Sequence, residues 1–306
     1  MSTDSTQAED ALLVYVNGEL RPKAEAAVNV FDHGLLYGDG VFEGLRVYNG
    51  KIFKLGQHLD RLWASAESLR IEIPVSRDEM EAIHRRCVEA NRIDNGYIRL
   101  IVTRGVGTLG LNPFKCPTPG IVCIADQIEL YTPEMYERGM RVVLAERPRV
   151  PVECLDPRIK SLNYLNNILA KIEAIDAGCL ECIMFNTQGQ LAEGSGDNIF
   201  LVKDGELFTP PTTVGVLEGI TRRFVKDELC PLLGLDCHEK VLDRDELFAA
   251  DEIFLTGSAA EMIAVTKIGK TDEDARVIGT GVEGVITAQV RQKFRQIVTS
   301  DRVPED

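Results

Sequence analysis

The chain has fewer basic than acidic residues, and it has no long apolar run. Its 306 residues include 34 lysines and arginines against 48 aspartates and glutamates, so the formal net charge is −14. Nucleic-acid binding needs a basic surface, and this balance argues against that class of partner. The apolar stretches are too short to cross a bilayer, and residues 1–10 are polar and acidic, unlike a signal peptide. We therefore predict a cytoplasmic protein with no membrane contact and a disordered tail over residues 1–10.

The sequence also lacks the cysteine spacing of a disulfide-stabilised fold. Its eight cysteines are scattered among strand-like and helix-like segments, which predicts reduced and mostly buried thiols. One pair, Cys179 and Cys182, has the spacing of a redox or metal motif. A metal would need two more ligands, which Cys230 and Cys237-His238 could supply only through a coincidence of folding. We interpret these residues as structural and predict no metal site.

The pattern of turns and apolar residues predicts an α+β fold. Asn17-Gly18 and Asn49-Gly50 each follow a strand-like run and are strong two-residue hairpin signals, and Asp204-Gly205 marks another hairpin. The residues from Ser76 to Glu79 form a capping-box sequence that begins a helix. The predicted strands are 13–16, 45–48, 97–103, 121–125, 141–145, 183–185, 199–202 and 206–208, and the predicted helices begin near residues 55, 77, 164, 219 and 284.

Two domains joined by a short linker account for this organisation. In this interpretation residues 11–128 form a small α/β domain and residues 139–306 form a large second domain. Residues 129–138 are polar and lack a helical or strand period, which favours an interdomain linker. No internal repeat is visible in the sequence.

A lysine and a glutamate carry the strongest chemical signal. Lys160 lies in the segment 158–164, and Glu193 lies in the segment 191–198, where glycines allow a ligand to approach the backbone closely. Pyridoxal phosphate (PLP) chemistry needs a lysine amine that can form a Schiff base and a carboxylate that holds the pyridine nitrogen protonated. Lys160 could also move a proton during the reaction, and Tyr164 is placed to hydrogen-bond the ring hydroxyl.

Two glycine-containing turns are candidates for binding the phosphate of this cofactor. Residues 217–222 open a predicted helix, whose first N–H groups and dipole bind anions. Residues 255–261 follow an apolar strand and could add donors. Arg61 could supply a fixed positive charge, although taken alone it is better explained as a surface helix cation paired with an acid.

Taken together, these segments resemble the class IV, fold type IV PLP-dependent aminotransferases, and most closely the branched-chain amino-acid aminotransferases. The resemblance runs from about Leu13 to Val298, nearly the whole chain. Its most specific motifs, in family order, are DHGLLYGDGVFEG at 32–44, KSLNY at 160–164, EGSGDNIF at 193–200 and GVLEGITR at 215–222.

The resemblance implies a two-domain, D-amino-acid aminotransferase-like fold with PLP bound between the domains. It implies Lys160 as the catalytic Schiff-base lysine, Glu193 at the pyridine nitrogen and Tyr164 at the ring oxygen. The other cofactor-binding residues that it implies are Arg61, Gly196, Leu217, Gly219, Ile220, Thr221, Gly257 and Ser258. It further implies a homodimer or higher oligomer whose active site borrows from the partner subunit a loop that includes Tyr37 and Leu109.

Substrate choice depends on the pair Tyr97 and Arg99. In branched-chain enzymes such a pair helps to receive carboxylates, Tyr97 the α-carboxylate and Arg99 the distal carboxylate of glutamate. An exposed strand arginine is the alternative for Arg99, and Arg104 is a second arginine that could face the site. The remaining predicted substrate-binding residues are Tyr37, Phe42, Leu109, Tyr131, Ser258 and Ala259.

We predict a branched-chain amino-acid transaminase that acts on L-leucine, L-isoleucine and L-valine with 2-oxoglutarate in a ping-pong reaction. A D-amino-acid or (R)-amine transaminase of the same fold is the alternative, and a 4-amino-4-deoxychorismate lyase is less favoured. A non-catalytic homologue predicts loss of Lys160 or Glu193, and neither is lost.

Overall fold

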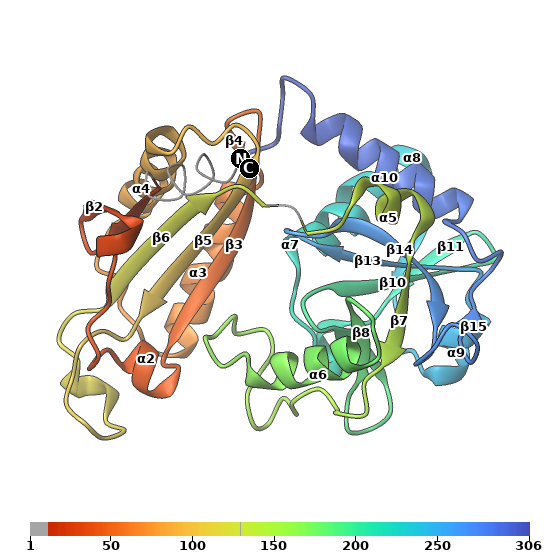
Figure 1. Ribbon diagram of the computed structural model, residues 1–306, viewed down its shortest axis with the longest axis horizontal. Helices are drawn as coiled ribbons and strands as arrows, with labels where there is room; N and C mark the ends of the chain where they lie inside the picture. The colour runs from red at the N-terminus through yellow and green to blue at the C-terminus, as the bar shows by residue number, and fades with distance from the viewer. Residues whose placement is uncertain (1–11, 129) are drawn as a thin grey trace, which may run out of the picture. The chain divides into compact units, whose positions relative to one another are not determined.

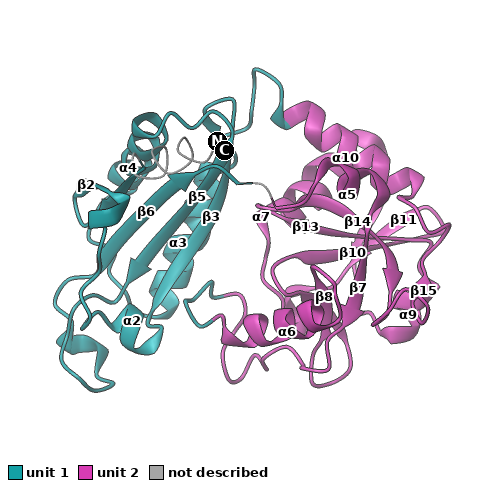
Figure 2. Ribbon diagram, in the orientation of Figure 1, with its two compact units in different colours: residues 1–128, 159–163, 298–306 teal, residues 129–158, 164–297 magenta. Residues whose placement is uncertain are grey.

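The computed structural model describes residues 12–128 and 130–306, so the predicted tail at 1–10 lies outside the described residues. The chain packs into two compact units (Figure 2). Unit 1 comprises residues 1–128 with the short segments 159–163 and 298–306, and unit 2 comprises residues 129–158 and 164–297. No helix in the described ranges is both long and apolar enough to span a membrane.

Unit 1 is built on a six-stranded antiparallel sheet in the order β2-β1-β6-β5-β3-β4 (Figure 1). The two predicted Asn-Gly hairpins are confirmed, and both Asn17 and Asn49 adopt the positive φ that such turns require. The strands are β1 (Leu13–Val16), β2 (Glu19–Pro22), β3 (Gly40–Tyr48), β4 (Lys51–Ile52), β5 (Gly96–Thr103) and β6 (Gly120–Asp126).

Two helices, α3 (Leu55–Ser68) and α4 (Arg77–Ala90), close the core of unit 1 against this sheet. The predicted capping box that begins α4 is confirmed, with Ser76 and Glu79 each satisfying the other's backbone N–H. Successive strand residues alternate between faces, so the buried Ile98 and Leu100 of β5 face the core while Tyr97 and Arg99 face the opposite side. Shorter elements of unit 1 are η1 (Lys23–Glu25), α2 (His33–Tyr37) and η2 (Pro113–Lys115).

Unit 2 contains a nine-stranded mixed sheet in the order β12-β11-β10-β13-β14-β7-β8-β9, with β15 paired to β14. The terminal strand β9 also contacts β10, so the sheet curls back on itself. The predicted Asp204-Gly205 hairpin joins β10 to β11 and is confirmed. The strands are β7 (Met140–Leu144), β8 (Cys182–Phe185), β9 (Leu191–Gly194), β10 (Asn198–Lys203), β11 (Glu206–Thr209), β12 (Cys237–Glu239), β13 (Glu252–Gly257), β14 (Glu261–Ile268) and β15 (Arg276–Val277).

The three helices predicted in unit 2 are confirmed, with one irregularity, and two further helices, α5 and α9, were not predicted. The segment predicted near 219–233 is helical throughout, but a π-helical stretch interrupts it in the middle. The elements are α5 (Pro133–Arg138), α6 (Leu165–Asp176), η3 (Thr212–Val214), α7 (Ile220–Phe224), η4 (Val225–Leu229), α8 (Cys230–Leu233), α9 (Arg244–Ala249) and α10 (Val285–Val298).

Three segments differ from the sequence-based organisation, and one of them, 298–306, was grouped with residues 139–306 but belongs to unit 1. The predicted linker at 129–138 contains helix α5, because Thr132 with Pro133 supplies a start signal, Gly139 supplies a stop, and Tyr136 packs on the unit 2 core. The segment 159–163 belongs to unit 1, although the sequence interpretation grouped it with residues 139–306. Its pairing with β3, through a bridge between Ser161 and Val41, is the physical reason.

Candidate active site

Lys160 lies in unit 1, on the segment that pairs with β3. Its carbonyl oxygen accepts a hydrogen bond from Phe42 N at 3.0 Å, and its own backbone N–H donates to Ser65 Oγ of α3 at 3.1 Å. Its Nζ lies 4.5 Å from the centre of the Phe42 ring. The backbone of Lys160 is therefore fixed to both a strand and a helix, while the half-buried amine lies over an aromatic face.

Three predicted substrate-binding residues lie together on the same side of the unit 1 sheet. Arg99 Cζ lies 4.7 Å from the centre of the Phe42 ring and 5.5 Å from that of Tyr97, and its NH2 donates to Tyr97 Oη at 3.2 Å. Gly44, opposite Arg99 in the sheet, leaves the room for this cluster, because a Cβ there would lie 1.8 Å from Tyr97 Oη. Since Phe42 also contacts Lys160, the structure brings the predicted lysine and the predicted carboxylate receptors together.

Arg61 is paired with a completely buried carboxylate rather than with a surface acid. Its Nε and NH2 donate to the Oε1 and Oε2 atoms of Glu43 at 2.7 and 2.8 Å, and His58 Nδ1 lies 2.7 Å from Oε2. Burial alone would raise the pKa of Glu43, but Arg61 and His58 hold it well below its usual range. Burial also lowers the pKa of His58, so its neutral ring donates Nδ1–H to the carboxylate. Arg61 is thereby a fixed positive charge on α3.

Tyr37 and the loop of Leu109 are also brought together in unit 1. Gly110 N donates to Tyr37 Oη at 2.9 Å, and His33 Nε2 lies 2.9 Å from Thr108 O. The side chain of Leu109 is 72% exposed. The structure thus places the two residues predicted for a partner-facing loop side by side and leaves the apolar one in solvent.

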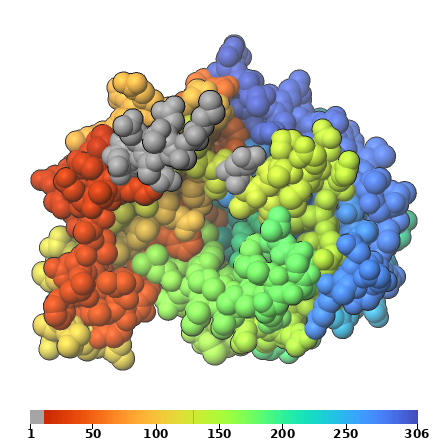
Figure 3. Space-filling model, in the orientation of Figure 1, coloured from red at the N-terminus to blue at the C-terminus, as the bar shows by residue number. Residues whose placement is uncertain are grey.

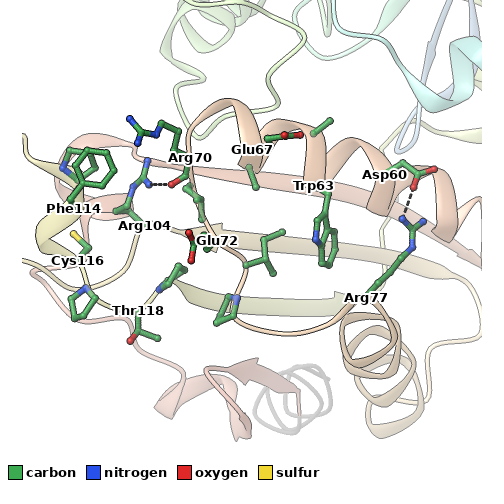
Figure 4. A pocket seen from close by; sticks show the side chains of 18 residues that line it. Asp60, Trp63, Glu67, Arg70, Glu72, Arg77, Arg104, Phe114, Cys116 and Thr118 are labelled. Carbon is green, nitrogen blue, oxygen red and sulfur yellow. Dashed lines mark hydrogen bonds and ion pairs between the residues drawn. The ribbon is translucent and has the colours of Figure 1, made fainter.

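Arg104 does not lie with the predicted substrate residues. Its guanidinium binds Asp39 at 2.8 and 3.0 Å and donates to the carbonyl oxygens of Leu69 and Arg70 at 2.6 and 2.8 Å. Figure 4 shows Arg104 at one end of a groove of about 1180 Å³ along α3, lined also by Trp63. The expectation that Arg104 could face the substrate is therefore not supported. Its guanidinium instead links the residues just after α3 to Asp39, just before β3.

Glu193 lies in unit 2, on β9, and three donors fix its buried carboxylate. Arg149 Nε donates to Oε1 at 2.8 Å, while Asn198 Nδ2 and Leu217 N donate to Oε2 at 3.2 and 3.0 Å. Arg149 is itself held by Asn167, whose Oδ1 accepts from NH1 at 3.1 Å. The carboxylate therefore has a fixed orientation and a matched positive charge.

The predicted phosphate-binding segment is attached to the same carboxylate. Asn198 Nδ2 also donates to Leu217 O at 2.8 Å. Gly219 is the N-cap residue of α7, and a Cβ there would lie 2.0 Å from Asn198 Oδ1. Ile220 and Thr221 are buried in the first turn of α7. The structure thus brings Leu217, Gly219, Ile220 and Thr221 together with Glu193.

Of the other predicted residues of unit 2, Gly196, Ser258 and Ala259 lie in turns between strands, and Tyr131 and Tyr164 lie just before helices. Ser258 and Ala259 are half-buried between β13 and β14, and Gly196 is exposed with no atom within 4 Å of where a Cβ would stand. Tyr131 is buried and its ring lies 5.9 Å from that of Tyr136, whose hydroxyl donates to Ala260 O. Tyr164 is the half-buried N-cap residue of α6.

The cysteine motif leads to no recognisable metal centre. Over residues 12–128 and 130–306, no group of three or more histidine, cysteine, aspartate or glutamate side chains is arranged to hold a metal ion. All eight cysteines are free thiols, and burial raises the pKa of both Cys179 and Cys182.

Comparison with known proteins identifies the family. The profile of the family described as amino-transferase class IV matches residues 40–268. The chain belongs to the class IV aminotransferases. A putative branched-chain-amino-acid aminotransferase of Methanocaldococcus jannaschii is 46% identical over 286 residues, which cover 94% of this chain and 96% of the relative.

Two further class IV comparisons bear on fold and substrate. The crystal structure of the branched-chain amino acid aminotransferase from Thermobaculum terrenum in its PLP form has a TM-score of 0.85 and 31% identity, covering 95% of each chain. The D-alanine aminotransferase of Bacillus licheniformis is 34% identical over 288 residues, covering 94% of this chain and 98% of the relative. The α+β, fold type IV prediction is confirmed.

The residues of this aminotransferase fit the PLP that its family uses. Thr256 Oγ1, one residue before Gly257, is buried and has no hydrogen-bond partner among the described residues. It lies opposite Asn198 in the sheet, next to the donors that hold Glu193. An unsatisfied hydroxyl beside an oriented carboxylate and a helix N-terminus suits a ligand that carries both a phosphate and a basic ring nitrogen.

Sequence reasoning missed the residues that support the class IV site. Arg149 lies between two prolines, Pro148 and Pro151, in a segment without periodicity, so no local signal tied it to Glu193. Asn198 and Glu43 both stand inside the motifs that carried the resemblance. A carboxylate inside a largely apolar strand was the available signal for Glu43.

Proposed function

We propose that this protein is a branched-chain amino-acid transaminase that uses L-leucine, L-isoleucine and L-valine as donors and 2-oxoglutarate as acceptor. The observation that carries the substrate assignment is the cluster of Phe42, Tyr97 and Arg99 beside Lys160. It combines an apolar ring with a guanidinium that can bind a carboxylate in a bidentate manner. The names of the related aminotransferases support the same assignment.

The chemistry of the site divides between the cofactor and this chain. When bound, PLP supplies a reactive carbonyl and an electron sink for the substrate carbanion. Lys160 supplies the amine that holds the cofactor and then accepts and returns a proton at Nζ. Glu193 binds the pyridine nitrogen, and Arg149 with Asn198 keeps its carboxylate in place.

The same proposal assigns the remaining cofactor contacts. Tyr164 binds the ring oxygen, and Gly196 leaves space for the ring to approach the backbone. The phosphate-binding residues in this proposal are Arg61, Leu217, Gly219, Ile220, Thr221, Gly257 and Ser258. Their support is a fixed guanidinium in unit 1 and the first turn of α7 in unit 2.

Substrate contacts are proposed on the unit 1 face and at the second turn of unit 2. Tyr97 and the turn at Ser258 and Ala259 receive the α-carboxylate, while Arg99 receives the distal carboxylate of glutamate. Phe42 and Tyr131 contribute apolar surface, and the partner subunit contributes Tyr37 and Leu109. When leucine binds, the guanidinium of Arg99 stays paired with the hydroxyl of Tyr97.

We propose that the enzyme is a cytoplasmic homodimer. The support for a dimer is apolar surface that a second copy could cover. Helix α6 lies at the surface (Figure 3), and four of its apolar side chains, at helical spacing, are 45–65% exposed: Leu165, Ile168, Ile172 and Ile175. The exposed Leu109 is a second such feature. Eight free thiols suit a reducing compartment.

A half-reaction experiment tests the function. The PLP-loaded enzyme is mixed separately with L-leucine, D-alanine and (R)-1-phenylethylamine while the visible absorbance of the lysine-bound cofactor is followed. The proposal requires L-leucine to bleach the band fastest and 2-oxoglutarate to restore it. Faster bleaching by D-alanine would contradict the proposal and identify a D-amino-acid transaminase instead. That is the second candidate, because the Bacillus licheniformis relative is named a D-alanine aminotransferase. Pyruvate release from 4-amino-4-deoxychorismate would instead identify a lyase.

A further inference from the structure

The segment 299–306 follows α10 and belongs to unit 1 (Figure 2, teal). Asn49 Nδ2, in the turn between β3 and β4, donates to Ser300 O at 3.4 Å. Lys51 Nζ, on β4, donates to Asp301 O. The segment therefore lies along the β3–β4 hairpin, which leads directly into α3. The function proposed above uses none of its residues.

This segment supplies hydrogen-bond acceptors at the start of α3. The first N–H groups of a helix have no carbonyl partners within the helix and need acceptors from elsewhere. The N-cap residue of α3 is Lys54, whose ammonium group has donors but no acceptor. Lys54 N donates to Pro304 O at 2.8 Å, and Gly56 N donates to Glu305 O at 3.2 Å. Two backbone carbonyls thus take the place of a side-chain cap.

Two acidic side chains of the segment lie beside the same helix start. Glu305 Oε1 accepts from Ile52 N at 3.3 Å and from Arg85 NH1 of α4 at 2.8 Å. A Cβ on Gly56 would stand 2.9 Å from Asp306 Oδ1, so that carboxylate lies against the first turn. Negative charge is favourable at the N-terminal end of a helix dipole. The side chains therefore strengthen the contact that the backbone carbonyls make.

Lys54 connects this contact to the buried ion pair of α3. Its carbonyl oxygen accepts from His58 N at 3.1 Å, in the first turn of the helix. The His58 ring in turn lies 2.7 Å from Glu43 Oε2, the carboxylate that holds Arg61 at 2.7 and 2.8 Å. A continuous series of hydrogen bonds therefore joins Pro304 to the carboxylate that fixes Arg61.

We propose that Pro304 and Glu305 are positioning residues for the phosphate of the cofactor. Their carbonyls keep the first turn of α3 from fraying, so that His58 and Arg61 stay in place around Glu43. The inference rests on the proposed function, which assigns Arg61 to the phosphate. Pro304 and Glu305 act through the helix and take no part in the chemistry.

Hydrogen exchange of the PLP-free enzyme tests the caps directly. The comparison is between the full chain and a variant that ends at Val303 and so lacks both carbonyls. Amide exchange at Lys54, Gly56 and His58 should be at least about fivefold faster in the shortened variant, the effect of one lost cap, while α6 keeps its wild-type rates. Arg302→Ala, at an exposed side chain of the same segment, is the matched control and should exchange as the wild type does. Unchanged exchange at these three amides in the shortened variant would overturn the proposal.

Cofactor binding tests the positioning role. Pyridoxal lacks the phosphate that Arg61 is assigned to bind. In the shortened variant the Kd for PLP should therefore rise about fivefold, while the Kd for pyridoxal should change by less than about twofold. Equal weakening of both ligands would show that the segment supports the fold in general, and no weakening of either would show that the caps do not reach Arg61. Both results refute the role.

A full-length variant keeps the test decisive if the shortened chain folds poorly. Glu305→Lys places a second cation beside Arg85, so it should loosen the segment and weaken PLP binding more than pyridoxal binding. Adding Arg85→Glu restores an ion pair of reversed order and should recover most of the affinity for PLP. No recovery in the double variant would contradict the role. Because hydrogen exchange needs neither cofactor nor turnover, the caps stand or fall separately from the proposed transaminase function.

Discussion

Arg149 Nε lies 2.8 Å from Glu193 Oε1, and each side chain is only 6% exposed. The carboxylate that we propose to bind the pyridine nitrogen is thus held in a buried position by a cation that is also buried. Asn166 and Asn167 accept from the same guanidinium at 3.0 and 3.1 Å, so the arginine has little freedom to move. In this arrangement the position of the carboxylate is set before any ligand binds.

Replacement of Arg149 by glutamine should be costly. Removing one partner of a buried ion pair leaves the other charge uncompensated, and we expect the free energy of unfolding to fall by about 3 kcal/mol. Denaturant unfolding of the PLP-free enzyme measures this loss. Arg147→Gln is the control, because its side chain is 46% exposed and its acid lies 3.8 Å away. A double variant, Arg149→Gln with Glu193→Gln, should recover part of the stability; if it recovers none, the pair is not the cause.

Replacement of Lys160 by alanine should abolish turnover while the chain stays folded. Without the amine no Schiff base with the protein can form, and we expect activity to fall by at least about 10³-fold together with loss of the visible absorbance band. Steady-state kinetics and an absorption spectrum after PLP loading check both. Lys270→Ala, at a surface lysine, should leave both unchanged. A persistent band in Lys160→Ala would show that another group holds the cofactor.

Replacement of Arg99 by methionine should affect the two half-reactions unequally. The long apolar side chain preserves the contact with Phe42 but removes the charge. Loss of a charged hydrogen-bond partner costs about 2 kcal/mol, so the KM for 2-oxoglutarate should rise by roughly 30-fold. The KM for L-leucine should change by less than about threefold. Equal changes for both substrates would place Arg99 outside the distal-carboxylate site.

Replacement of Gly44 by alanine should displace Tyr97. The new Cβ would stand 1.8 Å from the Tyr97 hydroxyl, so the ring must move, at a cost of about 1–3 kcal/mol in stability. The combination with Tyr97→Ala should remove most of this cost, because the clashing atoms are gone. Thermal unfolding of the four members of this cycle measures the coupling. Additive losses would show that Gly44 is required for another reason.

Acid should destabilise unit 1 through His84. Burial lowers the pKa of His84 to about 4, and its Nε2 has no hydrogen-bond partner among the described residues. Between pH 6.5 and 4 the unfolded chain binds a proton that the folded chain does not, so stability falls as the pH falls, by up to about 3 kcal/mol at pH 4.

His84→Leu removes this contribution, and its unfolding free energy should therefore fall less than that of the wild type over the same range. His58, whose pKa is also lowered, shifts both proteins in the same direction and cancels in the comparison. His238→Leu, at a half-exposed histidine, serves as the control. Parallel pH profiles for His84→Leu and the wild type would contradict this account.

The sequence by itself determined most of the local structure and the chemical class. Asn-Gly turns, a capping box and strand alternation are local signals, and they located β1, the end of β3, β5, β6 and α4 because each depends on residues close together in the chain. Lys160 and Glu193 were found in the same way, since each stands in a distinctive short motif. Residues 133–138 of the predicted linker form α5, where a start signal and packing by Tyr136 outweigh the weak periodicity.

Only the tertiary structure decided how the buried charges are paired. Arg149 is 44 positions from Glu193 and Glu43 is 18 from Arg61, and nothing local links either pair. Tertiary structure also turned Arg104 toward Asp39 and the end of α3. The physical reason is that a buried charge must find a partner wherever the fold provides one, and sequence spacing does not record that choice.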